Sequence, residues 1–466
     1  MEKIKIGFVP SHRNIFSKEW AIKMRERTIN ALSKISFLEL IVPTEEITNN
    51  GLISDENDAK KTIKLFSESN IDALLIGTMT FGEELPTISI AEFFKTKPIL
   101  LFGTKEGPFT TDGLRNSDSF CGTLSVSSGL YRRDIPFLFL GIVFPEEEKF
   151  LNKIISFIRT CNAVKGFLNT KVGLIGPRPY PFETCTINEI NLINKYGIRV
   201  QPISLISLYE DMEKISNNDK KVKEITEEVK SKADCSCIED NYLIKLAKME
   251  IVLEYYISNE GLSSLALSCW PDIPTLMNVS PCLVASRLTA KGIPTACEAD
   301  IYGALTMHIQ YLLSLGKEVP HFIDWTIQNQ TDNNLFLSWH CGNAPMCLAN
   351  LADKISIKEN SVAKNAFGEE NTKGAVEFQL KSGLVSLNRL VEYKGKFKML
   401  ITSGEIINKE MNLRGSWSWV KVSDLDKLYE TLVKEGFIHH ASMIYNDYQS
   451  SIADFCDILD IKRITV

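Results

Sequence analysis

The first hundred residues alternate apolar runs with amphipathic stretches, and this alternation constrains the fold more than any other feature of the sequence. The pattern predicts strands at Lys5–Val9, Phe37–Val42, Ile71–Ile76 and Pro98–Phe102, and helices at about Lys18–Ser33 and Asp55–Ser69. Strands that alternate with helices form parallel sheets covered on both faces. We therefore expect an N-terminal α/β domain over residues 1–168.

A second series of strands and helices begins at Lys171–Gly176. It includes a charged run from about Tyr209 to Lys232 with helical spacing, and it ends with a short strand that reaches Glu298. After about residue 326 the runs are short and broken by Gly and Asn, which is typical of antiparallel strands. The predicted fold class is α/β: two doubly wound parallel-sheet domains, 1–168 and 169–325, followed by a C-terminal antiparallel β domain, 326–466.

Composition excludes several classes of protein. The chain of 466 residues has a net charge of -6, and its basic runs alternate with acidic residues, so nucleic acid is not expected as a partner. No apolar stretch is long enough to span a bilayer, and the first residues read as a buried strand. The eleven cysteines lack the spacing of a disulfide framework, and Cys235 and Cys237 lack zinc-finger spacing. We expect a cytoplasmic protein with reduced thiols.

An acidic pair, Glu298 and Asp300, stands between a short apolar strand and a predicted helix. On an extended backbone the two side chains face the same side. Aspartate is a favoured N-cap residue, so the sequence predicts that Asp300 caps the helix that begins near Ile301. A carboxylate at Glu298 would be partly buried without an obvious partner. Glu298 is therefore the stronger functional candidate.

Further carboxylate and imidazole groups follow downstream: Asp324 at a predicted strand end, His340, and the pair His439-His440 before an apolar run. Sequence alone leaves a structural and a functional role equally open for each of them. Together these groups are what a borderline divalent cation accepts, and they can move protons beside a carbonyl group.

The run Cys297–Met307 resembles the metal-binding turn of the L-fucose isomerase and L-arabinose isomerase superfamily, in which a Glu-x-Asp turn precedes a helix. By this resemblance Asp324 is the second acidic ligand, His440 the late histidine ligand, and His340 the histidine of the arabinose branch. Asp324 matches the fucose branch instead, so the subfamily and the sugar stay open. A looser similarity extends to Cys121-Gly122 and to the helix from Pro281 to Leu288.

The resemblance implies a metal-dependent aldose–ketose isomerase that acts on an open-chain sugar through a cis-enediol intermediate. The sugar would be similar to L-fucose or L-arabinose, or a modified hexose such as sulfoquinovose. Glu298 and Asp324 would bind Mn²⁺ and form the base and acid pair, with His440 as nitrogen ligand. His340 would be a further ligand or a hydrogen-bond donor to the substrate. Co²⁺, Ni²⁺ and Zn²⁺ also suit these groups.

The substrate-binding residues are predicted more loosely. Trp270, Trp417 and Trp419 can stack on a sugar face, although a buried tryptophan more often belongs to the core. Arg13 resembles a substrate-contacting arginine of the fucose enzymes, where a neighbouring subunit of a homohexamer completes the pocket. Arg13, Arg132 or Arg133 could hold an anionic substituent, or could form surface ion pairs. Two other functions stay open: a non-catalytic sugar-binding or regulatory protein, and a metal-dependent lyase or epimerase.

Overall fold

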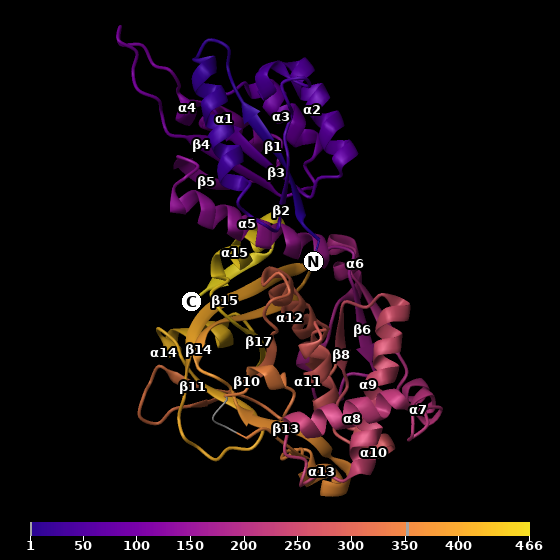
Figure 1. Cartoon of the computed structure of the whole chain (residues 1–466). Helices are drawn as coiled ribbons and strands as arrows, with labels where there is room; N and C mark the ends of the chain where they lie inside the picture. The colour runs from indigo at the N-terminus through magenta and orange to yellow at the C-terminus, as the bar shows by residue number, and fades with distance from the viewer. Residues whose placement is uncertain (1, 351–353) are drawn as a thin grey trace. The chain divides into compact units, whose positions relative to one another are not determined.

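The computed structural model describes residues 2–350 and 354–466, which form two compact units. Unit 1 contains the residues up to Lys165 together with Ser450–Asp460, and unit 2 contains Gly166–Gln449 and Ile461–Val466. Figure 1 shows the whole chain with its elements labelled. The division of the chain into domains 1–168, 169–325 and 326–466 stays a prediction.

Unit 1 is built on a parallel five-stranded sheet of order β2-β1-β3-β4-β5. Apolar clusters lie on both faces of the sheet, as expected where helices cover both. The four predicted strands are present, and β5 was not predicted. The elements are β1 (Ile4–Ser11), α1 (Lys18–Leu32), β2 (Leu38–Ile41), η1 (Asn49–Gly51), α2 (Glu56–Ser69), β3 (Ala73–Thr78), α3 (Glu84–Phe93), β4 (Ile99–Thr104), α4 (Ser119–Tyr131), β5 (Leu138–Val143) and α5 (Glu148–Phe167).

The end of the chain returns to unit 1 through α15 (Gln449–Ile458). Lys153 of α5 lies 2.7 Å from the Asp454 carboxylate of α15, and the hydroxyls of Ser156 and Ser451 lie 2.9 Å apart. These contacts join residues about 300 positions apart, so the sequence pattern alone did not predict them.

Unit 2 contains a smaller parallel sheet of order β7-β6-β8-β9. The charged run from Tyr209 to Lys232 forms two helices, because Asp219 caps a new helix start by accepting from the Lys221 N–H group. The elements up to this sheet's last helix are β6 (Lys171–Ile175), η2 (Glu183–Cys185), α6 (Glu189–Tyr196), β7 (Arg199–Ile203), α7 (Leu205–Glu213), α8 (Lys220–Lys232), α9 (Asp240–Glu260), β8 (Ser264–Leu267), α10 (Asp272–Met277), α11 (Cys282–Ala290), β9 (Thr295–Cys297) and α12 (Ile301–Leu313).

The rest of unit 2 is a nine-stranded, mostly antiparallel sheet of order β12-β13-β16-β11-β10-β17-β14-β15-β18. The predicted fold class is confirmed, and the pairs β13–β16 and β15–β18 are parallel. β15 also pairs with β16, which closes six of the strands into a ring. The elements are β10 (His321–Gln328), β11 (Leu335–His340), η3 (Met346–Leu348), β12 (Ser356–Glu359), α13 (Lys364–Phe367), η4 (Glu369–Asn371), β13 (Lys373–Gln379), β14 (Gly383–Tyr393), β15 (Lys396–Ile407), β16 (Ser416–Lys421), α14 (Leu425–Lys434), β17 (His440–Tyr445) and β18 (Lys462–Thr465).

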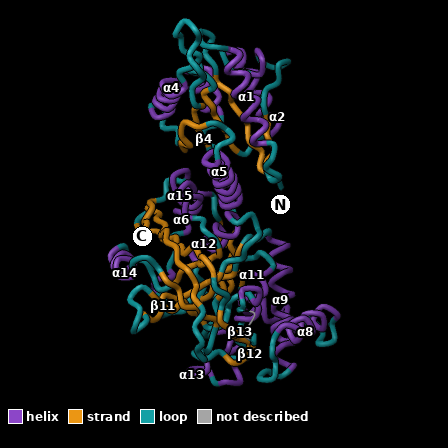
Figure 2. The backbone as a smooth tube through the Cα atoms, turned by 60° about the vertical axis from the view of Figure 1, so that its left-hand side comes forward, coloured by secondary structure: helices purple, strands orange, loops and turns teal. Residues whose placement is uncertain are grey.

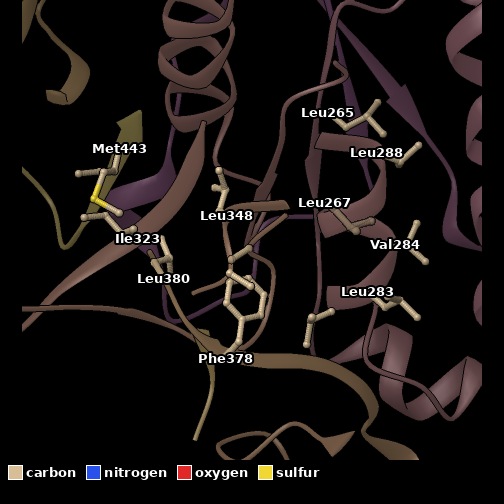
Figure 3. Close-up of a cluster of buried hydrophobic side chains, with 14 of the residues drawn as sticks. Leu265, Leu267, Leu283, Val284, Leu288, Ile323, Leu348, Phe378, Leu380 and Met443 are labelled. Carbon is tan, nitrogen blue, oxygen red and sulfur yellow. The ribbon is translucent and has the colours of Figure 1, made fainter. Parts of the chain in front are cut away.

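One apolar cluster joins the two sheets of unit 2. Figure 3 shows Leu265 and Leu267 of β8 and side chains of α11 in the same cluster as Ile323 of β10 and Met443 of β17. Figure 2 shows α12 next to strands of this unit, which are drawn in orange. Helix α12 packs on β14 and β17. Because the core is shared, groups after β9 and groups on β10 and β17 are held in fixed positions relative to one another.

Candidate active site

The turn that carries Glu298 has a left-handed backbone. Glu298 and Ala299 have φ of 58° and 57°, values that are uncommon for residues other than glycine. The expectation of an extended backbone at Glu298 is therefore wrong. Two hydrogen bonds hold the turn: the Ala299 N–H donates to the Leu267 carbonyl and the Asp300 N–H to the Cys297 carbonyl. Strain of this kind persists where the surroundings fix it, and it is common at functional sites.

Asp300 caps α12, as predicted. Its Oδ1 accepts a 2.9 Å hydrogen bond from the Gly303 N–H group. The same carboxylate accepts two hydrogen bonds from the guanidinium of Arg389 on β14, at 2.5 and 3.0 Å, and both side chains are 1% exposed. Burial opposes ionisation of Asp300, but the charges of Arg389 and His440 hold its pKa well below the usual range. Asp300 is thus an ionised, fully buried carboxylate.

His440, the first residue of β17, lies between the two acidic side chains of the turn. Its Nε2 is 2.6 Å from Glu298 Oε2, and its Nδ1 is 2.9 Å from Asp300 Oδ2. Burial opposes protonation of His440, but its hydrogen bonds to Asp300 and Glu298 raise its pKa well above the usual histidine value. A carboxylate can only accept, so both ring nitrogens carry protons in this arrangement.

Glu298 is held on its other oxygen as well. The indole N–H of Trp270 donates to Glu298 Oε1 at 3.2 Å, and the Trp270 ring packs edge-on against Phe182. Burial raises the pKa of Glu298, but the hydrogen bond and the charge of His440 outweigh this effect and lower it. Trp270 therefore lies at the site, where it donates a hydrogen bond to Glu298. The sequence predicted only that its ring could stack on a sugar.

Asp324 faces the same site from β10. It pairs across the sheet with His440 on β17 and Trp339 on β11, and its Oδ1 is 3.7 Å from His440 Nε2. That oxygen is buried, and it has no hydrogen-bond partner among residues 2–350 and 354–466. Burial raises the pKa of Asp324 to about 7. A buried carboxylate oxygen without a partner is costly unless a cation or a proton binds it.

His340, at the end of β11, lies next to this group. Its Nδ1 accepts a 2.9 Å hydrogen bond from the backbone N–H of Cys341. Its Nε2 is buried without a hydrogen-bond partner in the described part of the chain. Burial lowers the pKa of His340 to about 4, so the ring is neutral at neutral pH. Its ring is 6.4 Å from that of His440, measured between centroids.

The side chains can approach a single cation. Ligand atoms of Asp324, His340 and His440 lie within 4.8 Å of one another, as do those of Glu298, His439 and His440. The unsatisfied Asp324 oxygen and the mixed oxygen and nitrogen donors fit a divalent transition metal. The structure thus brings together Glu298, Asp324, His340 and His440; their roles stay predictions.

The other residues predicted to contact the substrate include Trp417, Trp419, Arg13 and Arg133. Trp417 pairs with Trp339 on the neighbouring strand and is buried in a small cluster that includes Trp419. Arg13 belongs to unit 1, where its guanidinium lies 4.1 Å from the Phe81 ring centroid and 3.3 Å from a Glu83 oxygen. Arg133, also in unit 1, donates to the Gly129 carbonyl at 3.0 Å. Their roles toward a sugar stay predictions.

Sequence reasoning missed two residues at the site. Arg389 is one, although an arginine next to the apolar residues Leu390 and Val391 favours a buried carboxylate partner. Cys185 is the other; its sulfur lies 3.9 Å from His440 Nδ1. Cys185 ends the short helix η2 and is 255 positions from His440, so the sequence gives no local signal of such a contact.

Comparison with known families shows which family the chain belongs to. The family described as "Fucose/sulfoquinovose isomerase, N-terminal domain" matches residues 7–168, and "L-fucose isomerase, C-terminal domain" matches residues 338–465. The chain belongs to the L-fucose isomerase and L-arabinose isomerase superfamily. As a member of this superfamily it is a sugar isomerase of the aldose–ketose class.

Relatives within the superfamily match nearly the whole chain. Sulfoquinovose isomerase of Priestia aryabhattai is 25% identical over 99% of both chains. Sulfoquinovose isomerase of Alkalicoccus urumqiensis is 24% identical over 85% of this chain and 86% of its own. L-arabinose isomerase of Shouchella clausii is 19% identical over 69% of this chain and 65% of its own. Among the described residues, no helix is both long enough and apolar enough to cross a membrane.

Proposed function

We propose that this protein is a metal-dependent isomerase that converts sulfoquinovose, an aldose with an anionic sulfonate group, into the corresponding ketose. Support for the substrate comes from the relatives named sulfoquinovose isomerase, one of which spans nearly the full chain. Support for the metal comes from one observation above all: the buried, unpartnered Oδ1 of Asp324 beside His440.

Glu298, Asp324 and His440 would hold the metal, and Mn²⁺ is the ion that the family resemblance favours. Bound there, the metal would polarise the sugar carbonyl as a Lewis acid. Metal binding requires His440 to give up its Nε2 proton, since that nitrogen now donates to Glu298. We further propose a cytoplasmic location and, by resemblance, a homohexamer.

The two carboxylates differ in the way that proton transfer requires. The pKa of Glu298 is lowered, so it is ionised and can take the proton from C2 of the open-chain aldose. The pKa of Asp324 in the metal-free protein is about 7, so this carboxylate can take up and release a proton near neutral pH. As an ionised ligand it would take the proton of the O2 hydroxyl and pass it to the carbonyl oxygen at C1, while Glu298 takes the proton from C2, which gives the cis-enediol as its anion. Return of the proton from Glu298 to C1 then yields the ketose and leaves both carboxylates ionised.

Replacing the base is the direct test of this mechanism. Glu298→Gln keeps the size of the side chain and can still accept from Trp270, so the fold should survive. We expect ketose formation to fall by at least about a thousandfold, because a neutral amide cannot take the proton. Ketose formation at the wild-type rate by Glu298→Gln would refute the mechanism.

The sugar is tested separately, by incubating the enzyme and Mn²⁺ with sulfoquinovose, L-fucose, L-arabinose and D-arabinose and following ketose formation. We expect sulfoquinovose to give the highest kcat/KM. A higher kcat/KM with a neutral sugar would overturn the substrate assignment but leave the isomerase mechanism standing.

A further inference from the structure

The two histidines nearest the carboxylates use their Nδ1 atoms in opposite ways. His440 Nδ1 faces the Asp300 carboxylate, which can only accept, so this nitrogen carries a proton. His340 Nδ1 faces the backbone N–H of Cys341, which can only donate, so this nitrogen offers its lone pair. The geometry around each ring thus fixes where its proton lies.

The protonation of Nδ1 in each ring determines what the Nε2 atom of the same ring can bind. With a proton fixed on Nδ1, His440 presents the lone pair of Nε2 once the Nε2 proton has left, as a metal ligand must. With its lone pair used at Nδ1, neutral His340 carries its proton on Nε2. A nitrogen that bears a proton cannot ligate a metal, but it can donate a hydrogen bond.

From these contacts we infer that His340 is a hydrogen-bond donor to a substrate oxygen during isomerisation, and not a ligand of the metal. The inference rests on the proposed function, because it assumes an open-chain sugar at the carboxylates. It departs from the ligand role that the arabinose branch suggests for this position.

Three observations support a donor role. His340 Nε2 is buried and lacks a partner among the residues described, so its N–H group is available to a ligand. Its ring is neutral, because Nδ1 accepts the hydrogen bond from the Cys341 N–H group and so carries no proton. The ring packs against Phe322, at 5.5 Å between centroids, which limits its freedom to flip. A positioned, neutral N–H donor stabilises the negative charge that develops on oxygen as the enediol forms.

Metal binding distinguishes a donor from a ligand. We propose to measure Mn²⁺ affinity by calorimetry and kcat with sulfoquinovose for His340→Ala and His340→Gln. Affinity should stay within about twofold of wild type in both, while kcat should fall about 100- to 1000-fold in His340→Ala. His340→Gln should recover part of kcat, because its amide can donate. A tenfold or greater loss of Mn²⁺ affinity in both variants would overturn the inference.

Two controls separate this role from a loss of stability and from a loss of the metal site. His308 is also buried, and its pKa is also lowered to about 4, but it lies on α12 and contacts the Gly166 carbonyl. His308→Gln should leave Mn²⁺ affinity and kcat unchanged. His440→Gln should bind Mn²⁺ tenfold to a hundredfold more weakly than the wild type, or more weakly still.

Electron spin echo spectroscopy of the Mn²⁺ enzyme gives an independent count of ligating nitrogens. One coupled imidazole nitrogen, lost in His440→Gln and kept in His340→Gln, is the expected result. Two coupled imidazoles in the wild type, one of them lost in His340→Gln, would overturn the donor role and leave the isomerase proposal intact. Failure of the wild type to bind Mn²⁺ or any other divalent transition metal would refute the proposed function itself, and this inference with it.

Discussion

Asp324 carries the least favourable electrostatics of the site. Its carboxyl is buried, and its pKa rises from 3.8 to about 7. In the unfolded chain Asp324 loses its proton near pH 4, whereas in the folded, metal-free protein it keeps the proton up to about pH 7. The unfolded state therefore binds fewer protons between these values, and stability falls as pH rises through this range. Such a cost is characteristic of a residue kept for binding or chemistry.

Asp324→Asn should therefore stabilise the metal-free protein at pH 8 by roughly 2–4 kcal/mol, since one pKa unit corresponds to about 1.4 kcal/mol. At about pH 3, below the pKa of Asp324 in the unfolded chain, the difference should nearly vanish, because Asp324 is then largely protonated in both the folded and the unfolded state. Urea unfolding with a chelator present, at both pH values, measures this. Equal stabilities at pH 8 would show that the Asp324 carboxylate is not destabilised by burial.

The raised pKa of Asp324 also predicts how metal binding depends on pH. Asp324 must be ionised to ligate a cation, and His440 must release its Nε2 proton. Mn²⁺ affinity should thus fall as pH drops through about 7, and the pH dependence should be weaker in Asp324→Asn. Calorimetry between pH 6 and 8 checks this. An affinity that does not change over this range would contradict the assignment of Asp324 as a ligand.

At the scale of elements, the start of α12 is tied to β14 by a buried ion pair, Asp300–Arg389. Helix α12 could be predicted because its cap and its apolar face are both local features. The ion pair that joins α12 to β14 could not be predicted, because Arg389 is 89 positions from Asp300 and the sequence does not show how the two elements align. The residues next to Glu298 in the sequence indicated a functional role for it. The strain of its turn, in contrast, is seen only in the backbone angles of the structure.

Removing one member of this pair should cost more than removing both. Arg389→Met leaves the Asp300 charge buried without its partner, and we expect a loss of about 3–5 kcal/mol in the free energy of unfolding. The double variant Asp300→Asn, Arg389→Met should recover a large part of this loss, because no unpaired charge remains and asparagine still caps α12. Urea unfolding of the single and double variants gives the coupling energy.

A second buried pair provides the matched control for the site. Arg287 and Glu250 are 5% and 1% exposed and lie 2.6 Å apart. Arg287→Met should destabilise the protein without changing the Mn²⁺ affinity of the folded fraction. Arg389→Met should lower that affinity as well, because Asp300 orients His440. Equal Mn²⁺ affinities in the two variants would limit Arg389 to a structural role.

At the scale of the whole molecule, the sequence predicted which segments form parallel sheets and which form antiparallel strands. It did not predict the β15–β16 pairing that closes the ring of strands, nor the apolar core shared by both sheets of unit 2. Both depend on contacts between distant segments, which periodicity does not encode. The shared core explains how Glu298, after β9, and Asp324, on β10, come to face the same histidine.

Arg13 lies in unit 1, whereas the carboxylates lie in unit 2, so its role concerns the whole molecule. Its Nε is buried and unpaired within the described residues, while Glu83 partly balances its charge. The resemblance to the fucose enzymes predicts that Arg13 contacts the sugar bound by a neighbouring subunit, and we propose that role for it. Hydrogen bonds to charged groups contribute about 1.5–3 kcal/mol, so Arg13→Ala should lower kcat/KM by tenfold to more than a hundredfold.

Mixing two impaired variants tests whether Arg13 acts between subunits. If it does, a site in a mixed oligomer can take Glu298 from an Arg13→Ala subunit and Arg13 from a Glu298→Gln subunit. Random association of equal amounts gives both native residues at about a quarter of the sites, so refolding the variants together should restore up to that share of activity. If Arg13 serves its own subunit, every subunit of the mixture keeps a defect, and activity stays at the level of the separate variants. Light scattering on the same samples gives the oligomeric state, and a monomer would exclude action between subunits outright.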